Sequence, residues 1–264
     1  MNWEIRQGLP KATSAALGAA SVALALLLWL SVTWSADVEQ RWVSPLVLPS
    51  PGDVVHSFGP LHWTQGLTRG VVYSLARVTA GFLLAAAVAI PLGVAMGAFT
   101  QVRAFVGPLS VIGGYVPIAA LVPLTISWFG LGESQKVAFL FIASFFMLLP
   151  MVVKSIADVD EVYLQTGYTL GASRWQTIRH VLVPVAAGDI YDHLRTLYGV
   201  GWGYIILAEL VAAEHGLGHI IQVSQRRGRI EEVFAILLVI LAIAIAIDQL
   251  FRAVGELLFP YRHR

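Results

Sequence analysis

Long stretches without a charged side chain constrain this chain more than any other feature of its sequence. The first such run extends from Ala12 to Trp34. At about 1.5 Å per residue, a helix of this length crosses a hydrocarbon core of roughly 30 Å. Hydrophobic residues make up 57% of the chain and charged residues only 12%, far more apolar than a soluble domain requires. The sequence therefore predicts an all-α, polytopic membrane protein.

We expect one transmembrane domain over residues 1–264, with about six spans. The predicted spans are 12–34, 69–99, 102–130, 135–154, 187–213 and 231–258. Segment 35–66 contains four prolines and the turn-rich stretch "LPSPGDVV", so it is expected to be an external connector. Prolines also occur inside the spans, which favours helices packed against protein, although simple kinks are an alternative.

The distribution of lysine and arginine predicts the orientation. Six spans put both termini on one face together with Arg6, Lys11, Arg103, Lys154, Arg174, Arg179, Arg195, Arg252, Arg262 and Arg264. The other face has Arg41, Arg69, Lys136, Arg226, Arg227 and Arg229. Because basic loops are retained in the cytoplasm, the first face is predicted to be cytoplasmic. The cluster "QRRGR" at 225–229 runs against this rule.

A polar segment at 158–184 separates the fourth and fifth predicted spans. Its central stretch, "GYTLGASRWQTIRHVLVP", predicts a helix that ends at Gly171 and a second helix that Ser173 caps. Gly171 and Ala172 leave little bulk at the turn, which suits close approach by a partner. Connections between helices are usually only 2–8 residues long. This segment is therefore interpreted as a docking element, with a folded connector as the alternative.

The Gly-Ala-Ser turn followed by Val-x-x-Pro resembles the signature loop of the inner-membrane permease subunits of binding-protein-dependent ABC importers. Five other stretches share the resemblance, so that it covers nearly the whole chain: "LVLPSPGDVV", "SLARVTAGFLLAAAVAIPLGVAMG", "VPIAALVPLTISWFGLGESQK", "AELVAAEHGLGHII" and "FAILLVILAIAIAIDQLFR". They look like the branch that transports nitrate, sulfonates, taurine, bicarbonate and similar small anions.

This resemblance implies a type I importer permease fold and a multi-pass protein of the bacterial inner membrane with both termini in the cytoplasm. The chain would form half of the pathway for a small, anionic solute. Its implied partners are a second permease subunit, expected to be a second copy, two ATPase subunits, a substrate-binding protein and membrane lipid, but no nucleic acid. ATP and Mg would be bound by the ATPase, so this chain is expected to have no cofactor and no enzymatic activity.

By the same resemblance, residues 160–180 form the coupling helix that docks the ATPase. The residues expected to make this contact are Leu164, Gln165, Thr166, Gly167, Leu170, Gly171, Ala172, Ser173 and Trp175. The family usually has Glu-Ala-Ala where this chain has Gln165, Thr166 and Gly167. The acid is therefore absent and the helix more flexible, so we expect docking to depend on Gly171, Ala172 and the flanking helices.

Several polar residues lie in or beside the apolar runs and are candidates for the pathway or the protein interior: Arg77, Tyr115, Trp202, Tyr204 and Glu209. Charged groups at such positions usually face a bundle interior or a water-filled path. An ion pair between Arg77 and Glu209 is one hypothesis. The glycines of "GVGWG" (199–203) and the pair Gly93 and Gly97 predict close helix packing.

Asp189, Asp192 and His193 share one helix face. We interpret this trio as a hydrogen-bonded elbow that could meet Arg195 or the docking segment, with a metal site as the alternative. Neither a metal site nor a catalytic residue is predicted. Two other functional classes stay open. A membrane-embedded enzyme would need this trio, and a scaffold or receptor would keep the docking segment without transporting a solute.

Overall fold

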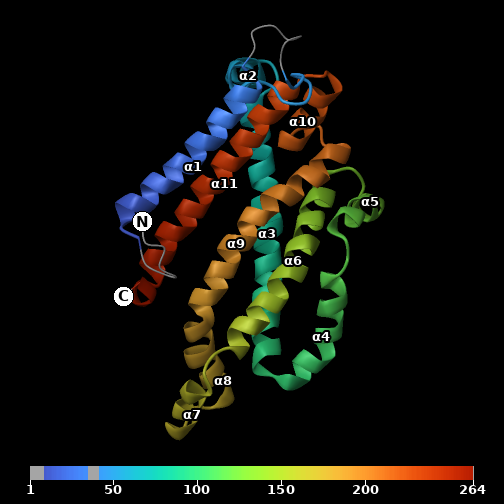
Figure 1. The fold of residues 1–264 in the computed structure, drawn as a ribbon. Helices are drawn as coiled ribbons and strands as arrows, with labels where there is room; N and C mark the ends of the chain where they lie inside the picture. Colours follow the sequence, from blue (N-terminus) through green and yellow to red (C-terminus); the bar gives the residue numbers. More distant parts are fainter. Residues whose placement is uncertain (1–8, 35–41, 264) are drawn as a thin grey trace. The chain divides into compact units, whose positions relative to one another are not determined.

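The computed structural model describes residues 9–34 and 42–263, and in that part of the chain all regular structure is helical (Figure 1). Three arginines of the orientation prediction lie outside the described residues: Arg6, Arg41 and Arg264. The same holds for residues 35–41 of the predicted connector. The α-helices are α1 (Lys11–Val32), α2 (Pro51–Trp63), α3 (Leu67–Ala98), α4 (Thr100–Gly114), α5 (Ile118–Phe129), α6 (Glu133–Ala157), α7 (Glu161–Thr169), α8 (Arg174–Thr177), α9 (Val183–Ala212), α10 (Leu217–Arg226) and α11 (Ile230–Leu258). A π-helical turn, η2 (Ile178–Leu182), joins α8 to α9, and a 3-10 turn, η3 (Pro260–His263), follows α11.

Four helices are long and apolar enough to cross a membrane: α1 from Ala12, α3, α6 and α11. The bent pair α4 and α5 makes a fifth if it counts as one span. Helix α9 corresponds to the predicted fifth span and has 30 residues. Its mean hydropathy is lower than that of the four apolar helices, because it contains the charged residues Asp189, Asp192, Arg195 and Glu209.

The predicted third span, 102–130, is broken rather than continuous. Helices α4 and α5 meet at an angle of 102°. Pro117 has no N–H to continue the hydrogen-bond ladder and disfavours a helical conformation at Val116, so the first helix ends at Gly114 and the second begins after the proline.

The chain divides into two compact units. The first comprises Met1–Gln65 and Val223–Ile236. In it, Ser50 and Asp53 form a capping box at the start of α2, and the Trp29 indole N–H donates to the Pro49 carbonyl at 2.9 Å. The buried carboxylate of Glu232 accepts hydrogen bonds from Gln65 and Ser224 at 2.6 and 2.7 Å.

The second unit comprises Gly66–Gln222 and Leu237–Arg264 and holds α3, α6 and α9. Glycines allow α3 to lie directly against α6 (Figure 1). At three glycines of α3, an added Cβ atom would lie only 2.5–2.7 Å from a side chain of α6, closer than side chains can approach. The three pairs are Gly81–Leu140 at 2.5 Å, Gly93–Val152 at 2.7 Å and Gly97–Ile156 at 2.6 Å. The packing role predicted for Gly93 and Gly97 is therefore confirmed.

Within the described part of this chain, the glycine of "GVGWG" that meets another helix is Gly201. Gly199 and Gly203, which share a helix face, have open space where a Cβ would stand, whereas a Cβ on Gly201 would lie 3.4 Å from Val78 of α3. The small face at 199 and 203 is therefore unpacked within the described chain. Periodicity placed these two glycines together but did not indicate which face of α9 meets α3.

Candidate functional site

The polar segment between α6 and α9 is an ordered helix-turn-helix. Helix α7 begins where Asp160 Oδ1 accepts a hydrogen bond from the Val162 N–H at 2.9 Å. It ends in a double hydrogen bond: the Ala172 N–H donates to the Gly167 carbonyl at 3.0 Å, and the Gly171 N–H donates to Tyr168 at 2.9 Å. This is the Schellman pattern, and Gly171 supplies its left-handed residue with φ of +80°.

The second half of the turn is fixed by a capping box. The Ser173 hydroxyl accepts from the Gln176 N–H at 3.4 Å, and the Gln176 side chain accepts from the Ser173 N–H at 2.8 Å. The predicted cap at Ser173 is thus confirmed. Because both sides of the turn satisfy their backbone groups locally, the turn holds its shape without a partner.

The turn presents apolar side chains outward. Leu170 is 83% exposed and Trp175 75% exposed, although both are large hydrophobic residues. Gln165, Thr166, Gly171 and Ser173 are also exposed, Leu164 and Ala172 are half-buried, and Gly167 is buried. A Cβ on Gly167 would find its nearest neighbours at 3.7 and 3.8 Å, which are ordinary contact distances. A glycine at position 167 is therefore not required by packing.

A second polar site is buried where α3 meets the start of α6 and the end of α9. Arg77 of α3 is 3% exposed. Its Nη1 lies 2.7 Å from Oε1 of Glu209 and 2.6 Å from the His215 carbonyl, and its Nε lies 2.6 Å from Oε2 of Glu133. The ion pair that the sequence suggested between Arg77 and Glu209 is present. The sequence did not indicate the second carboxylate, Glu133.

Every polar atom of the Glu209 carboxylate has a partner. Oε1 and Oε2 accept from the Ser74 hydroxyl at 2.8 and 2.9 Å, and Oε2 accepts from the Gly218 N–H at 2.8 Å. A Cβ at Gly216, where φ is +127°, would stand 2.5 Å from the carboxylate. The two glycines of "HGLGH", Gly216 and Gly218, therefore leave room for the Glu209 side chain. The hydrogen bonds of Glu209 to Ser74 and Gly218 hold the turn from α9 to α10 against α3.

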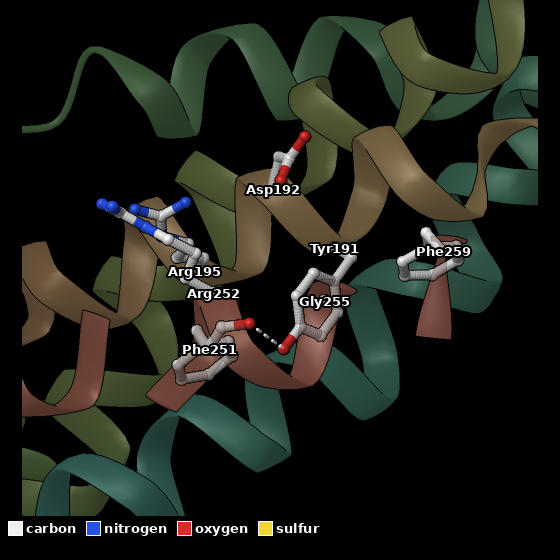
Figure 2. Close-up of a pocket in the computed structure, with 7 residues that line it drawn as sticks. All are labelled: Tyr191, Asp192, Arg195, Phe251, Arg252, Gly255 and Phe259. Atoms are coloured by element: carbon white, nitrogen blue, oxygen red, sulfur yellow. Dashed lines mark hydrogen bonds between the residues drawn. The ribbon is translucent and has the colours of Figure 1, made fainter. Parts of the chain in front are cut away.

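A third polar site joins α9 to α11. Arg195 binds Asp248 through two hydrogen bonds, Nε to Oδ1 at 2.5 Å and Nη2 to Oδ2 at 2.8 Å. Figure 2 shows the adjoining pocket of about 240 Å³, with Asp192 and Arg195 on α9 and Arg252 and Gly255 on α11. The Tyr191 hydroxyl closes one wall by donating to the Phe251 carbonyl at 2.7 Å. Asp248 of α11 is a partner of Arg195 that the sequence analysis did not name.

The structure brings only some of the predicted interior residues together. Arg77 and Glu209 are in contact and Trp202 is buried, whereas Tyr115 is exposed at the break between α4 and α5. Tyr204 is half-buried and its hydroxyl lies 3.1 Å from the Met147 sulfur. Arg77 and Glu209 therefore contact each other in the protein interior, whereas neither tyrosine contacts this pair through a hydrogen bond among the described residues.

Comparison with known proteins identifies related chains. Residues 89–260 match the family described as "Binding-protein-dependent transport system inner membrane component". The chain is 32% identical to the taurine transport system permease protein TauC of Escherichia coli over 241 residues, which cover 89% of this chain and 87% of that protein. It is 27% identical to the putative aliphatic sulfonates transport permease protein SsuC of Bacillus subtilis, covering 84% and 80% of the two chains.

The fold has a solved counterpart. A chain of the MetNI methionine ABC transporter in an inward-facing conformation superposes with a TM-score of 0.62 at 20% identity. The match covers 74% of this chain and 98% of that chain. The predicted type I importer fold is therefore confirmed.

Proposed function

This chain belongs to the family of binding-protein-dependent transport system inner membrane components and is the permease subunit of an ABC importer, and on that premise we propose that residues 160–180 couple it to the ATPase. The observation that carries this proposal is the preformed turn with exposed Leu170 and Trp175. Apolar groups held outward by a locally satisfied backbone suit a groove on a partner protein.

The mechanism follows from where this segment lies in the fold. Helix α8 continues through η2 into α9 without an intervening loop. In this proposal, movement of the docked turn is passed directly to α9, the predicted fifth span. We propose that ATP, bound with Mg by two separate ATPase subunits, favours their closed arrangement, and that two copies of this permease respond by exposing the central site to the outer face. Such a switch is a population shift driven by differential binding.

The proposed assembly is a homodimer of this chain in the bacterial inner membrane, with both termini in the cytoplasm and a substrate-binding protein on the outer face. The relatives named for taurine and aliphatic sulfonates support a small organic sulfonate as the solute. In this proposal Arg77 and Glu209 act as interior residues. Tyr115 is exposed and Tyr204 half-buried, and these two side chains line the solute pathway.

The test is co-purification with a tagged copy of this chain. Ala172 is half-buried in the turn, so Ala172→Glu would place a bulky charge at the proposed contact without altering the transmembrane helices. The ATPase subunit and its ATP hydrolysis should accompany the wild type and the control Val55→Glu, which alters an exposed residue of α2, but not Ala172→Glu. Retention of the ATPase by Ala172→Glu would contradict the proposal.

Uptake distinguishes transport from a scaffold role. Proteoliposomes that contain the permease, its ATPase and its binding protein should accumulate labelled taurine only when ATP is hydrolysed. A scaffold would keep the co-purification and fail this assay. Accumulation of a heterocyclic solute instead of taurine would overturn the sulfonate proposal alone, since a riboflavin transport system permease protein of Chloroflexus aurantiacus is 27% identical to this chain.

A further inference from the structure

An apolar groove of about 470 Å³ lies between α3 and the segment that links α8 to α9. Ile90 and Val94 line it from α3, and Ile178 and Val183 line it from the other side. Its volume falls within the ~300–1,000 Å³ typical of small-molecule sites. All of these residues belong to the second compact unit, so the groove is a property of that unit alone.

The π-helical turn η2 builds one wall of the groove. In this turn the Val183 N–H donates to the Ile178 carbonyl, five residues earlier, and both side chains face the groove. Single π turns within α-helices frequently mark functional sites. One wall of the groove is therefore an irregular stretch of backbone, and the other is the regular helix α3.

The position of the groove along α3 selects the kind of ligand. Helix α3 is apolar enough to span a membrane and ends at Ala98. At 1.5 Å per residue, Val94 and Ile90 lie about 6 and 12 Å before that end. Ile90 therefore lies deeper along the apolar helix than the mouth of the groove, which Trp175 and Arg179 of the polar segment line.

One end of the groove is polar and basic. Arg179 is exposed there, and in the portion of the chain that the structure describes it forms no ion pair. Trp175 lies beside it and is largely exposed. Basic side chains at the membrane surface attract anionic headgroups, so Arg179 is the residue at this end that selects the ligand. An apolar groove with the unpaired Arg179 at its mouth is complementary to a molecule that has an apolar chain and an anionic headgroup.

We propose that this groove binds an anionic phospholipid, with an acyl chain against Ile90 and Val94 and the phosphate at Arg179. Such a lipid would bridge α3 and η2. It would thereby hold the segment that carries the docking turn against the membrane helix. The lipid would be a structural ligand of the permease, separate from the transported solute.

The proposal is tested by native mass spectrometry of the full chain in detergent, titrated with phosphatidylglycerol or with phosphatidylcholine of the same acyl chains. Val94→Trp fills the groove, and Arg179→Gln removes its charge. We expect Val94→Trp to weaken binding of both lipids at least tenfold. Arg179→Gln should abolish the preference for phosphatidylglycerol and leave phosphatidylcholine unchanged.

Two controls separate the groove from general lipid contact. Val72→Trp adds the same ring to an exposed position on α3, and Arg174→Gln removes a neighbouring exposed arginine. Both should bind lipid as the wild type does. Circular dichroism reports whether each variant is folded, and Ile90→Gln, which makes the groove polar without adding bulk, replaces Val94→Trp if that variant fails to fold.

Three outcomes would overturn the proposal. Equal lipid binding by Val94→Trp and the wild type would show that the groove holds no acyl chain. Binding of inorganic phosphate at Arg179 when neither phospholipid binds would identify a phosphate site without a lipid. Loss of the dimer in Val94→Trp with unchanged lipid binding would assign the groove to a second copy of this chain.

Discussion

Arg77 and Glu209 form a buried ion pair, with 2.7 Å between Nη1 and Oε1, although 131 residues separate them in the sequence. Glu209 is fully buried and Arg77 is 3% exposed. The arginine also reaches Glu133, whose side chain is 60% exposed, so one guanidinium links three helices. This geometry makes the pair a fixed point of the second unit and gives it a measurable role in stability.

Removing either partner of this pair should destabilise the protein more than removing both. Arg77→Leu leaves the buried Glu209 carboxylate without a charged partner, and Glu209→Leu leaves the buried Arg77 paired only with the exposed Glu133. Removing one partner of a buried ion pair typically costs about 3–5 kcal/mol. The double variant buries no lone charge at this position and should unfold at a higher temperature than either single variant. Thermal unfolding in detergent, followed by circular dichroism, measures the order of the three variants. Additive losses in the double variant would contradict the pairing.

Alanine at Gly216 should be poorly tolerated. The residue has φ of +127°, and an added Cβ would meet the Glu209 carboxylate at 2.5 Å. Backbone strain alone costs of order 1–3 kcal/mol, and the clash adds to it. Gly199→Ala is the matched control, because that glycine is helical and has open space around it. The control should be neutral or gain roughly 0.5–1 kcal/mol in the free energy of unfolding. Equal unfolding temperatures for the two variants would exclude the steric account.

Two glycines of the docking turn should respond differently to alanine. Gly171 is left-handed, a conformation that costs other residues about 1–2 kcal/mol, so Gly171→Ala should reduce ATPase co-purification. Gly171→Asn should retain more of it, because asparagine tolerates this conformation. Gly167→Ala should bind the ATPase at least as well as the wild type, because a Cβ fits there. Loss of binding in Gly167→Ala and not in Gly171→Ala would reverse the assignment.

The contact between α9 and α11 should survive exchange of its charges. Arg195→Asp and Asp248→Arg each place like charges opposite one another and should lower the unfolding temperature. The double exchange restores an ion pair across the same helices and should recover most of the loss. Arg252→Gln serves as the control: its single hydrogen bond to Asp248 is 3.3 Å long and leaves the two-bond pair with Arg195 intact. A double variant no more stable than the single ones would show that the two side chains do not interact directly.

Local signals in the sequence were reliable wherever the chain determines structure over a few residues. The cap at Ser173, the stop at Gly171 and the apolar helices require only neighbours within one or two turns. The family was likewise readable from contiguous stretches. The sequence placed Pro117 within the predicted third span, but a proline in a span permits either a kink or a full interruption, and the structure has the interruption.

Partner choice required the tertiary structure. The sequence suggested Glu209 as the partner of Arg77, yet only packing added Glu133 to this pair. Packing also placed Asp248 against Arg195, a contact that the sequence did not suggest. It likewise determined that Gly201, not Gly199 or Gly203, faces α3. Hydrophobicity, helix periodicity and capping are properties of adjacent residues, so the sequence alone determined a helical membrane permease with a capped turn at 170–173. Which helix faces meet depends on the rotation and approach of segments more than a hundred residues apart, and the tertiary structure alone decided it.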